Sequence, residues 1–361
     1  MKNIYIYISG ACNLRCHYCF ARRNHSNRQI MTTATAEATV DWFIKWLGRE
    51  KEGHICFFGG EPLLNWAGLT FAVDYARQQA RRLKKKISFS VTTNGTLFTR
   101  EKAAFLRKHG FGILVSVDSH RPALQTRLRP ACDGEDSFRP VVEGLKLFKK
   151  PAKILLRATL NSQNTDLVGY IKYFSKFPAV GDFAFVEEYP GGGAARQRRA
   201  VEAYKQAWDK YLAYIFKNWE KGNIIDPRAL LGAARACRLI GKRAVPKYCC
   251  GAGENNLAVA ANGDIYFCQN FVGLPKFRLG NVARGIDREK QRRWQRAATF
   301  ANRKGCQKCG AKTVCQGECH YINYAATGRI DRPDSLSCEI QKYRLGLGQK
   351  LIDKIDELIA A

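Results

Sequence analysis

Three cysteines near the amino terminus, Cys12, Cys16 and Cys19, follow one another in the spacing C-x₃-C-x₂-C. Structural zinc sites usually have four protein ligands, and iron–sulfur clusters are normally held by four thiolates. A set of three thiols that are close in sequence therefore has two interpretations. Either the fourth ligand comes from elsewhere in the chain, or one metal position is left open for chemistry.

A second group of cysteines lies in the last third of the chain. Its members are Cys250, Cys268, Cys306, Cys309, Cys315, Cys319 and Cys338, and Cys249 adds a possible eighth. Eight thiols are what two four-ligand sites require. Because C-x₂-C pairs bind both metals, spacing alone leaves zinc and iron–sulfur open. The remaining cysteines are expected to be inert or buried thiols: Cys56, Cys132 and Cys237.

The composition of the 361-residue chain favours metal over disulfide for its 14 cysteines. The start, MKNIYIYISG, resembles a first strand rather than an export signal, so we expect a reducing, cytoplasmic compartment. No membrane span is expected, because the sequence has no apolar run of about 18 residues. The net charge of +29 attracts polyanions such as nucleic acid, acidic lipid or an acidic peptide. No nucleic-acid motif accompanies this charge, so nucleic acid is disfavoured as a partner.

Short β-rich runs alternate with helical patterns from residue 3 to about residue 220. The expected strands cover residues 3–9, 54–58, 87–92, 113–117, 154–160 and 183–186. The expected helices include residues 35–47, 69–83, 100–108, 138–148, 167–174 and 201–219. Consecutive βα units predict an α/β fold with a parallel sheet and right-handed crossovers. Periodicity alone does not decide between an open sheet and an incomplete barrel.

The alternation of β-rich and helical patterns ends before the second cysteine group. From Cys249 onward the chain is rich in cysteine and glycine, which suggests a small domain folded around metals rather than around a large core. We therefore expect two domains, residues 1–230 and residues 231–361.

Polar or glycine-rich residues follow each of the first four strands. They are the three-cysteine loop, Gly59-Gly60-Glu61-Pro62, Thr92-Thr93-Asn94-Gly95-Thr96, and Ser116 with Asp118 and Ser119. Ligands of parallel α/β folds bind where the carboxyl ends of the strands meet. We therefore expect one shared pocket at this edge.

The first motif, with Tyr18 directly before its last cysteine, resembles the signature of the radical S-adenosylmethionine (SAM) enzymes. This resemblance implies a partial (β/α)6 TIM-type barrel. It also implies that Cys12, Cys16 and Cys19 hold a [4Fe-4S] cluster whose open iron binds the amino and carboxylate groups of SAM. Homolysis of the carbon–sulfur bond would then give a 5′-deoxyadenosyl radical.

The strand-end residues match the same family. Gly59, Gly60, Glu61 and Pro62 resemble the family's GGEP segment, which contacts the methionyl amino group. The other implied SAM contacts are Asn94, Ser116 and Asp118 for ribose and methionine, Arg157 for the carboxylate, and Tyr18 near adenine.

The carboxyl-terminal part resembles the SPASM domain, which holds two auxiliary [4Fe-4S] clusters. By that resemblance Cys306, Cys309, Cys315 and Cys338 hold one cluster, and Cys250, Cys268 and Cys319 hold the other. Either Cys249 supplies the missing ligand, or one iron is open to a substrate thiol. The implied total is three clusters.

Residues 250–282 are similar to maturases of ribosomally made peptides (RiPPs) that install thioether or other crosslinks. Sulfatase maturases carry an aspartate, proposed as a base, directly after the cysteine equivalent to Cys268. Gln269 stands here, and an amide cannot accept a proton at neutral pH. We therefore expect an oxidoreductase that abstracts hydrogen from a precursor peptide and crosslinks it. The alternatives are sulfatase-maturase-like oxidation of cysteine or serine, a radical RNA-modifying enzyme, and a zinc-stapled nucleic-acid-binding protein.

The chain begins at once with its first expected strand, whereas many peptide maturases carry a leader-binding domain before it. Leader binding is thus expected to use the barrel, the SPASM domain or a separate protein. A low-potential electron donor such as a ferredoxin or flavodoxin is the other expected partner.

Overall fold

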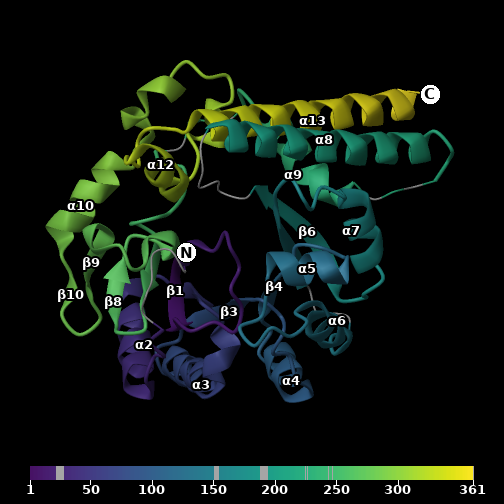
Figure 1. Ribbon diagram of the computed structural model, residues 1–361. Coiled ribbons are helices and arrows are strands. Elements are labelled where there is room, and N and C mark those ends of the chain that lie inside the picture. Colours follow the sequence, from purple (N-terminus) through teal and green to yellow (C-terminus); the bar gives the residue numbers. More distant parts are fainter. Residues whose placement is uncertain are drawn as a thin grey trace.

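The computed structural model describes residues 1–21, 28–149, 154–187, 194–223, 225, 227–242, 244–245 and 247–360. A single ten-stranded sheet runs in the order β10-β9-β8-β7-β1-β2-β3-β4-β5-β6 (Figure 1). Its parallel half consists of β1 (Lys2–Ser9), β2 (Glu52–Gly59), β3 (Lys86–Thr93), β4 (Gly112–Ser116), β5 (Ile154–Leu160) and β6 (Val180–Glu187). All six predicted strands are present, and each lies beside its neighbour in sequence.

Helices cover the outer face of this half-barrel (Figure 1). They are α2 (Thr33–Leu47), α3 (Trp66–Arg82), α4 (Arg100–Lys108), α6 (Phe138–Lys146) and α7 (Leu167–Phe174), as the periodicity predicts. Side chains directly before four of them cap the first turn: Thr32, Asn65, Thr99 and Asp166. The short helix α5 (Pro122–Leu128) was not predicted, and Pro122 occupies its first turn.

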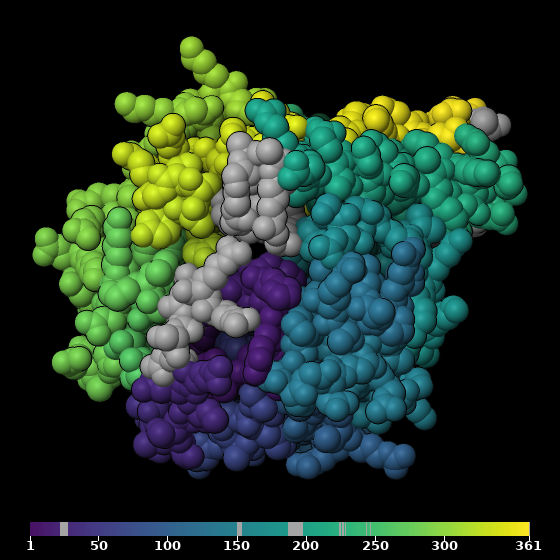
Figure 2. Space-filling model, viewed as in Figure 1, coloured from purple at the N-terminus to yellow at the C-terminus, as the bar shows by residue number. Residues whose placement is uncertain are grey.

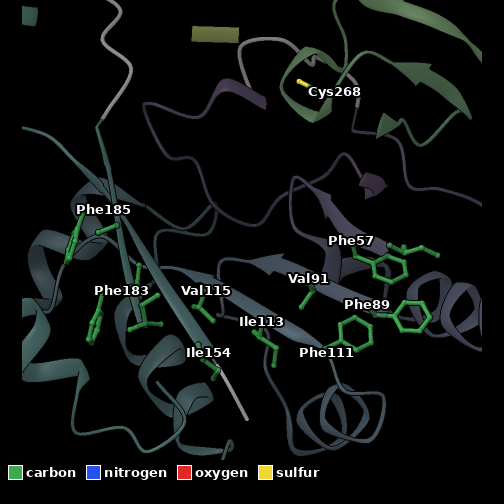
Figure 3. Packing of buried hydrophobic residues seen from close by; sticks show 14 of the residues in the cluster. Phe57, Phe89, Val91, Phe111, Ile113, Val115, Ile154, Phe183, Phe185 and Cys268 are labelled. Carbon is green, nitrogen blue, oxygen red and sulfur yellow. The ribbon is translucent and has the colours of Figure 1, made fainter. Parts of the chain in front are cut away.

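The strands sort their side chains by face. Ile4 and Ile6 of β1 are completely buried against the helices, whereas Tyr5 lies between them on the opposite, inner face. Figure 3 shows the outer cluster on the neighbouring strands, where the ring of Phe89 lies 6.5 Å from that of Phe57. The inner face carries mostly polar groups: His54, Cys56, Ser88, Ser90, Thr92 and Arg157. Tyr7 and Phe58 on the inner face belong to a smaller apolar cluster. The large hydrophobic core thus lies on the outside, and the polar part of the inner face is left for function.

The carboxyl-terminal strands extend the same sheet. They are β7 (Asn256–Val259), β8 (Asp264–Tyr266), β9 (Arg278–Asn281) and β10 (Gly285–Ile286), and β7 pairs in parallel with β1. Leu257, Ile265 and Phe267 belong to the same hydrophobic cluster as Ile4. The expectation of a region folded around metals rather than a large core is therefore wrong in this respect. The reason is that the free edge of β1 is paired, which buries the apolar side chains of the added strands.

Three helices form a further layer at the β6 end of the sheet. The long helices α8 (Ala194–Trp219) and α13 (Ser335–Ala360) lie side by side, and α9 (Arg228–Arg238) packs against α13 (Figure 1). A Cβ at Gly348 would lie 2.5 Å from the carbonyl carbon of Ala233, so a glycine is needed where α13 crosses α9. Among the described residues, no helix is both long and apolar enough to cross a membrane.

Short elements connect the cysteines of the carboxyl-terminal region. They are α10 (Arg288–Ala297), α11 (Lys312–Cys315), α12 (His320–Thr327) and the 3₁₀ turns η2 (Gln269–Phe271), η3 (Pro275–Phe277), η4 (Phe300–Asn302) and η5 (Lys304–Cys306). Cys268, Cys306, Cys315 and Cys319 lie at or next to the ends of these short elements, and Cys338 lies in the first turn of α13.

Candidate active site

The loop that carries the first three cysteines leaves the carboxyl end of β1 and is held by the segment after α5. The backbone N–H of Arg15 donates to the carbonyl of Pro130 (2.7 Å), and that of Cys132 donates to the carbonyl of Asn13 (2.9 Å). These two bonds fix the loop from its far side. No sequence signal pointed to this anchoring segment.

The thiols of this loop lie in a setting that favours metal over free thiolate. Cys16 is 8% exposed, and Cys12 and Cys19 are half-buried. Burial raises the pKa of Cys12 to about 12 and that of Cys16 to about 11. At neutral pH these groups are protonated unless a cation replaces the protons, as metal binding does. The three residues thus fit a metal-bound cluster.

The glycines of the loop after β2 allow it to lie directly against the cysteine loop. A Cβ at Gly59, whose φ is +130°, would lie 2.2 Å from the carbonyl oxygen of Ser9. A Cβ at Gly60 would lie 2.3 Å from the carbonyl oxygen of Ala11. The N–H groups of Gly60 and Glu61 donate to these same two oxygens, at 2.9 and 2.8 Å. The glycines are therefore required for contact between backbones.

Replacing Gly60 by alanine is expected to displace the cysteine loop, because the new methyl group would overlap backbone rather than a movable side chain. We expect a loss of about four irons per chain in anaerobically purified protein, measured by colorimetric iron analysis. Gly232→Ala is the matched control, since a Cβ at Gly232 in α9 meets nothing within 4 Å. Full iron content in Gly60→Ala would contradict the expected role of this glycine.

Glu61 is completely buried and ties the end of β2 to the end of β3. Its Oε1 accepts from Thr93 Oγ1 (2.7 Å) and from the N–H of Leu63 (3.0 Å), and its Oε2 accepts from the N–H of Asn94 (2.7 Å). Burial raises the pKa of Glu61 despite these bonds. Pro62 then begins the 3₁₀ turn η1 (Pro62–Asn65). Both carboxylate oxygens thus serve to hold the strand ends in place.

Asn94 joins the end of β3 to the cysteine loop. Its Nδ2 donates to Asn13 Oδ1 (2.9 Å) and lies 3.9 Å from Cys12 Sγ, while its Oδ1 accepts from the N–H of Thr96 (2.9 Å). The structure therefore brings Cys12, Glu61 and Asn94 together at one edge, as the sequence predicted.

Asp118 and Tyr18 also meet at this edge, in a buried network that includes Arg129. Asp118 is 1% exposed and accepts from the Tyr18 hydroxyl. Arg129 Nη1 donates to the Tyr18 oxygen (2.6 Å) and lies 3.5 Å from Asp118 Oδ2. Arg129 was not predicted, because nothing distinguishes it among 60 lysines and arginines of the sequence.

Arg157 and Ser116 are register partners at the ends of β5 and β4. The Nε of Arg157 is buried without a hydrogen-bond partner in the described part of the chain. Burial lowers the pKa of Arg157, and the nearby Arg129 adds to the effect. A buried guanidinium with an unused donor suits an anionic ligand, because carboxylates accept such donors strongly.

The structure gathers four cysteines of the second group around the start of α13. Burial raises the pKa of Cys338 to about 11, and its neighbours Cys306 and Cys315 add to this increase. Cys309 follows in a turn whose N–H donates to the carbonyl of Cys306 (3.1 Å). These are the four cysteines that the sequence assigned to one cluster.

The other cysteines of that group meet beside β8. Burial raises the pKa of Cys268, and the nearby Cys319 and Cys250 raise it further. The ligand atoms of Cys249, Cys250 and His320 all lie within 4.8 Å of one another. His320 was not singled out from the sequence, since a lone histidine after a cysteine carries no specific signal. All fourteen cysteines lie in the described ranges and are free thiols, which fits metal binding.

Aromatic side chains pack between the two cysteine regions. The Phe20 ring, next to Cys19, lies 6.3 Å from that of Phe58 and 5.7 Å from that of Tyr321. The Tyr7 hydroxyl donates to the carbonyl of Gln269 (2.6 Å). Figure 2 shows the amino-terminal segment (purple) at the bottom of a hollow between the carboxyl-terminal part (green and yellow) and the β4–β6 half (blue to teal).

Comparison with known proteins identifies the class. The model of the radical SAM superfamily matches residues 6–153. The radical SAM cyclopropyl synthase TigE of Paramaledivibacter caminithermalis is 30% identical over 95% of this chain and 72% of its own length. A cysteine-type anaerobic sulfatase-maturating enzyme of Clostridium perfringens is 28% identical over 86% of each chain. The chain therefore belongs to the radical SAM superfamily, and it is an enzyme that uses SAM and a [4Fe-4S] cluster.

Solved structures agree on the fold along the whole chain. The structure titled native anSMEcpe with bound AdoMet has a TM-score of 0.78 at 23% identity, over 99% of both chains. Streptococcus suis SuiB has a TM-score of 0.60 at 17% identity, over 92% of this chain and 76% of its own. The α/β partial barrel with its cysteine-rich carboxyl-terminal region is thus confirmed. The particular relatives are a radical SAM cyclopropyl synthase and sulfatase-maturating enzymes.

Proposed function

We propose that this enzyme is a SPASM peptide maturase that abstracts hydrogen from a ribosomally made precursor peptide and closes a new bond within it, a thioether or another crosslink. The observation that carries the proposal is the hollow between the carboxyl-terminal part and the β4–β6 half of the molecule, with the amino-terminal segment at its bottom (Figure 2). An extended peptide laid there would be within reach of both cysteine regions.

The residues at the strand ends would bind SAM. Cys12, Cys16 and Cys19 would hold the cluster, and when bound the cluster and SAM supply the 5′-deoxyadenosyl radical. The unused donor of Arg157 would bind the SAM carboxylate. Gly59 to Pro62, Asn94, Ser116, Asp118 and Tyr18 would shape and orient the rest of the cofactor site, because their hydrogen bonds and close packing hold the loop in place.

The carboxyl-terminal cysteines would hold two auxiliary [4Fe-4S] clusters, one on Cys306, Cys309, Cys315 and Cys338 and the other on Cys250, Cys268 and Cys319. Their function would be to accept the electron left over when the new bond forms. Within this proposal, residues 1–230 cleave SAM and residues 231–361 carry the auxiliary clusters. A ferredoxin or flavodoxin would supply low-potential electrons, and a separate protein could present the leader of the peptide.

Relatives support a peptide substrate. One solved structure is titled SuiB bound to precursor peptide SuiA, and another is anSMEcpe with a bound Cp18Cys peptide. The choice of bond formation over sulfatase-type oxidation rests on Gln269. Its amide cannot take a proton at neutral pH, and its backbone carbonyl is already bound to Tyr7. TigE, named a cyclopropyl synthase, is also a relative that makes a new bond.

The experiment is co-expression of this enzyme with the short open reading frames that neighbour its gene, followed by mass spectrometry of the encoded peptides. Bond formation removes two hydrogen atoms from the peptide and leaves no aldehyde, so a hydrazide probe should not react. A peptide that loses two hydrogen atoms and does react with the probe would favour serine-type sulfatase chemistry. An unchanged mass, with SAM still cleaved, would contradict a peptide substrate.

A further inference from the structure

A completely buried arginine lies beside the second auxiliary site. Arg303 Nη2 lies 2.6 Å from His320 Nδ1 and 3.5 Å from Cys249 Sγ. Its Nη1 donates to the carbonyls of Gly317 and Glu318. Buried polar groups need hydrogen-bond partners. Among the described residues, Cys249 Sγ is the one thiol sulfur within hydrogen-bond distance of Arg303.

The same arginine determines which nitrogen of His320 carries the ring proton. A guanidinium has only donors, so Nδ1 of His320 must accept from Arg303. The proton of the neutral ring is then on Nε2, which lies 3.3 Å from Cys249 Sγ. A protonated ring nitrogen cannot bind a metal. His320 therefore donates to the sulfur of Cys249 instead of competing with it as a ligand.

The backbone around this group is built to hold it. Gly317 has a φ of +86°, and a Cβ there would lie 2.4 Å from Arg303 Cδ, so only glycine leaves room for the arginine side chain. The Gln316 amide, oriented to donate, reaches the carbonyls of Tyr248 (3.2 Å) and Cys249 (3.0 Å). The position of Cys249 is thus fixed from two sides.

Building on the proposed function, we propose that Cys249 is the fourth ligand of the cluster on Cys250, Cys268 and Cys319, and that Arg303 and His320 are positioning residues that donate hydrogen bonds to its sulfur. All four irons of this cluster are then bound by thiolates of the chain. A substrate thiol does not bind iron here, and the cluster acts by electron transfer. Hydrogen bonds to a ligating sulfur tune the reduction potential of a cluster.

The test compares full-length wild-type protein, reconstituted anaerobically, with Cys249→Ala, His320→Gln and the matched control Cys237→Ala. Cys237 is a cysteine of α9 whose sulfur donates to the carbonyl of Leu345, away from the clusters. Iron content, electron paramagnetic resonance and potentiometric titration are the readouts. Cys249→Ala should lose, or convert to a three-iron form, the signal of one auxiliary cluster. His320→Gln should keep the iron and shift the midpoint potential, and Cys237→Ala should match wild type.

Nitrogen hyperfine spectroscopy of the reduced protein decides whether the fourth ligand of this cluster is the Cys249 sulfur or the His320 imidazole. Wild type should show no directly coordinated histidine nitrogen. A strong nitrogen coupling that disappears in His320→Gln would overturn the inference, as would stoichiometric zinc or a Cys249→Ala protein with unchanged iron and spectra. A wild-type protein with only about four irons would instead remove the auxiliary clusters, and with them the proposed function.

Discussion

Replacing Cys16 by alanine is expected to reduce reductive cleavage of SAM to the level of a protein-free control. Cys16 is the most buried thiol of the first loop, at 8% exposed. Burial raises its pKa to about 11, so the thiolate is stable there only as a metal ligand. Removing one of the three thiolates leaves a four-iron cluster with only two protein ligands. Iron content should fall by about four per chain.

The measurement is the yield of 5′-deoxyadenosine under anaerobic conditions with dithionite, together with iron analysis. Cys237→Ala is again the matched control, because its sulfur lies outside both cysteine regions and contacts the carbonyl of Leu345. It should retain full cleavage. If Cys16→Ala still cleaved SAM with its iron intact, Cys16 would not be a ligand and the assignment of the first cluster would be wrong.

The half-barrel could be predicted well because the local sequence pattern of each strand and helix agrees with the element that it forms. Alternation in β1 and glycine-rich turns after β2 are short-range signals, and parallel strands bring their carboxyl ends to one edge whatever the loop details. Cys12, Glu61 and Asn94 could therefore be placed together from sequence alone. Their hydrogen bonds could not, because those depend on which loop packs on which.

Residues that act through contacts with distant parts of the sequence could not be predicted. Arg129 reaches Tyr18 across 111 positions of sequence, and Arg303 reaches Cys249 across 54. In a chain of net charge +29 an arginine carries no signal of its own. The pairing of β7 with β1 could not be predicted either. A four-residue strand in a cysteine-rich stretch is too short to show its partner.

Breaking the buried pair of Asp118 and Arg129 is expected to cost more stability than any exposed ion pair of this protein. The side chain of Asp118 is 0% exposed and that of Arg129 is 9% exposed. Arg129→Leu leaves the Asp118 carboxylate buried without its paired cation, which costs about 3–5 kcal/mol of the free energy of unfolding. The double variant Asp118→Leu/Arg129→Leu removes both charges and should lose less than the sum of the two single variants.

Chemical denaturation of the reconstituted protein, followed by tryptophan fluorescence, measures these differences. Arg121→Leu is the control, because Arg121 is 63% exposed and pairs with Asp166 at 3.0 Å on the surface. Its loss should change the free energy of unfolding by about 0–1 kcal/mol. Arg129→Leu should also weaken SAM binding, since Tyr18 loses its hydrogen-bond donor and Asp118 loses its paired cation beside the cysteine loop. Equal losses for Arg121→Leu and Arg129→Leu would mean that burial does not set the strength of this pair, and that the network does not hold the cofactor site.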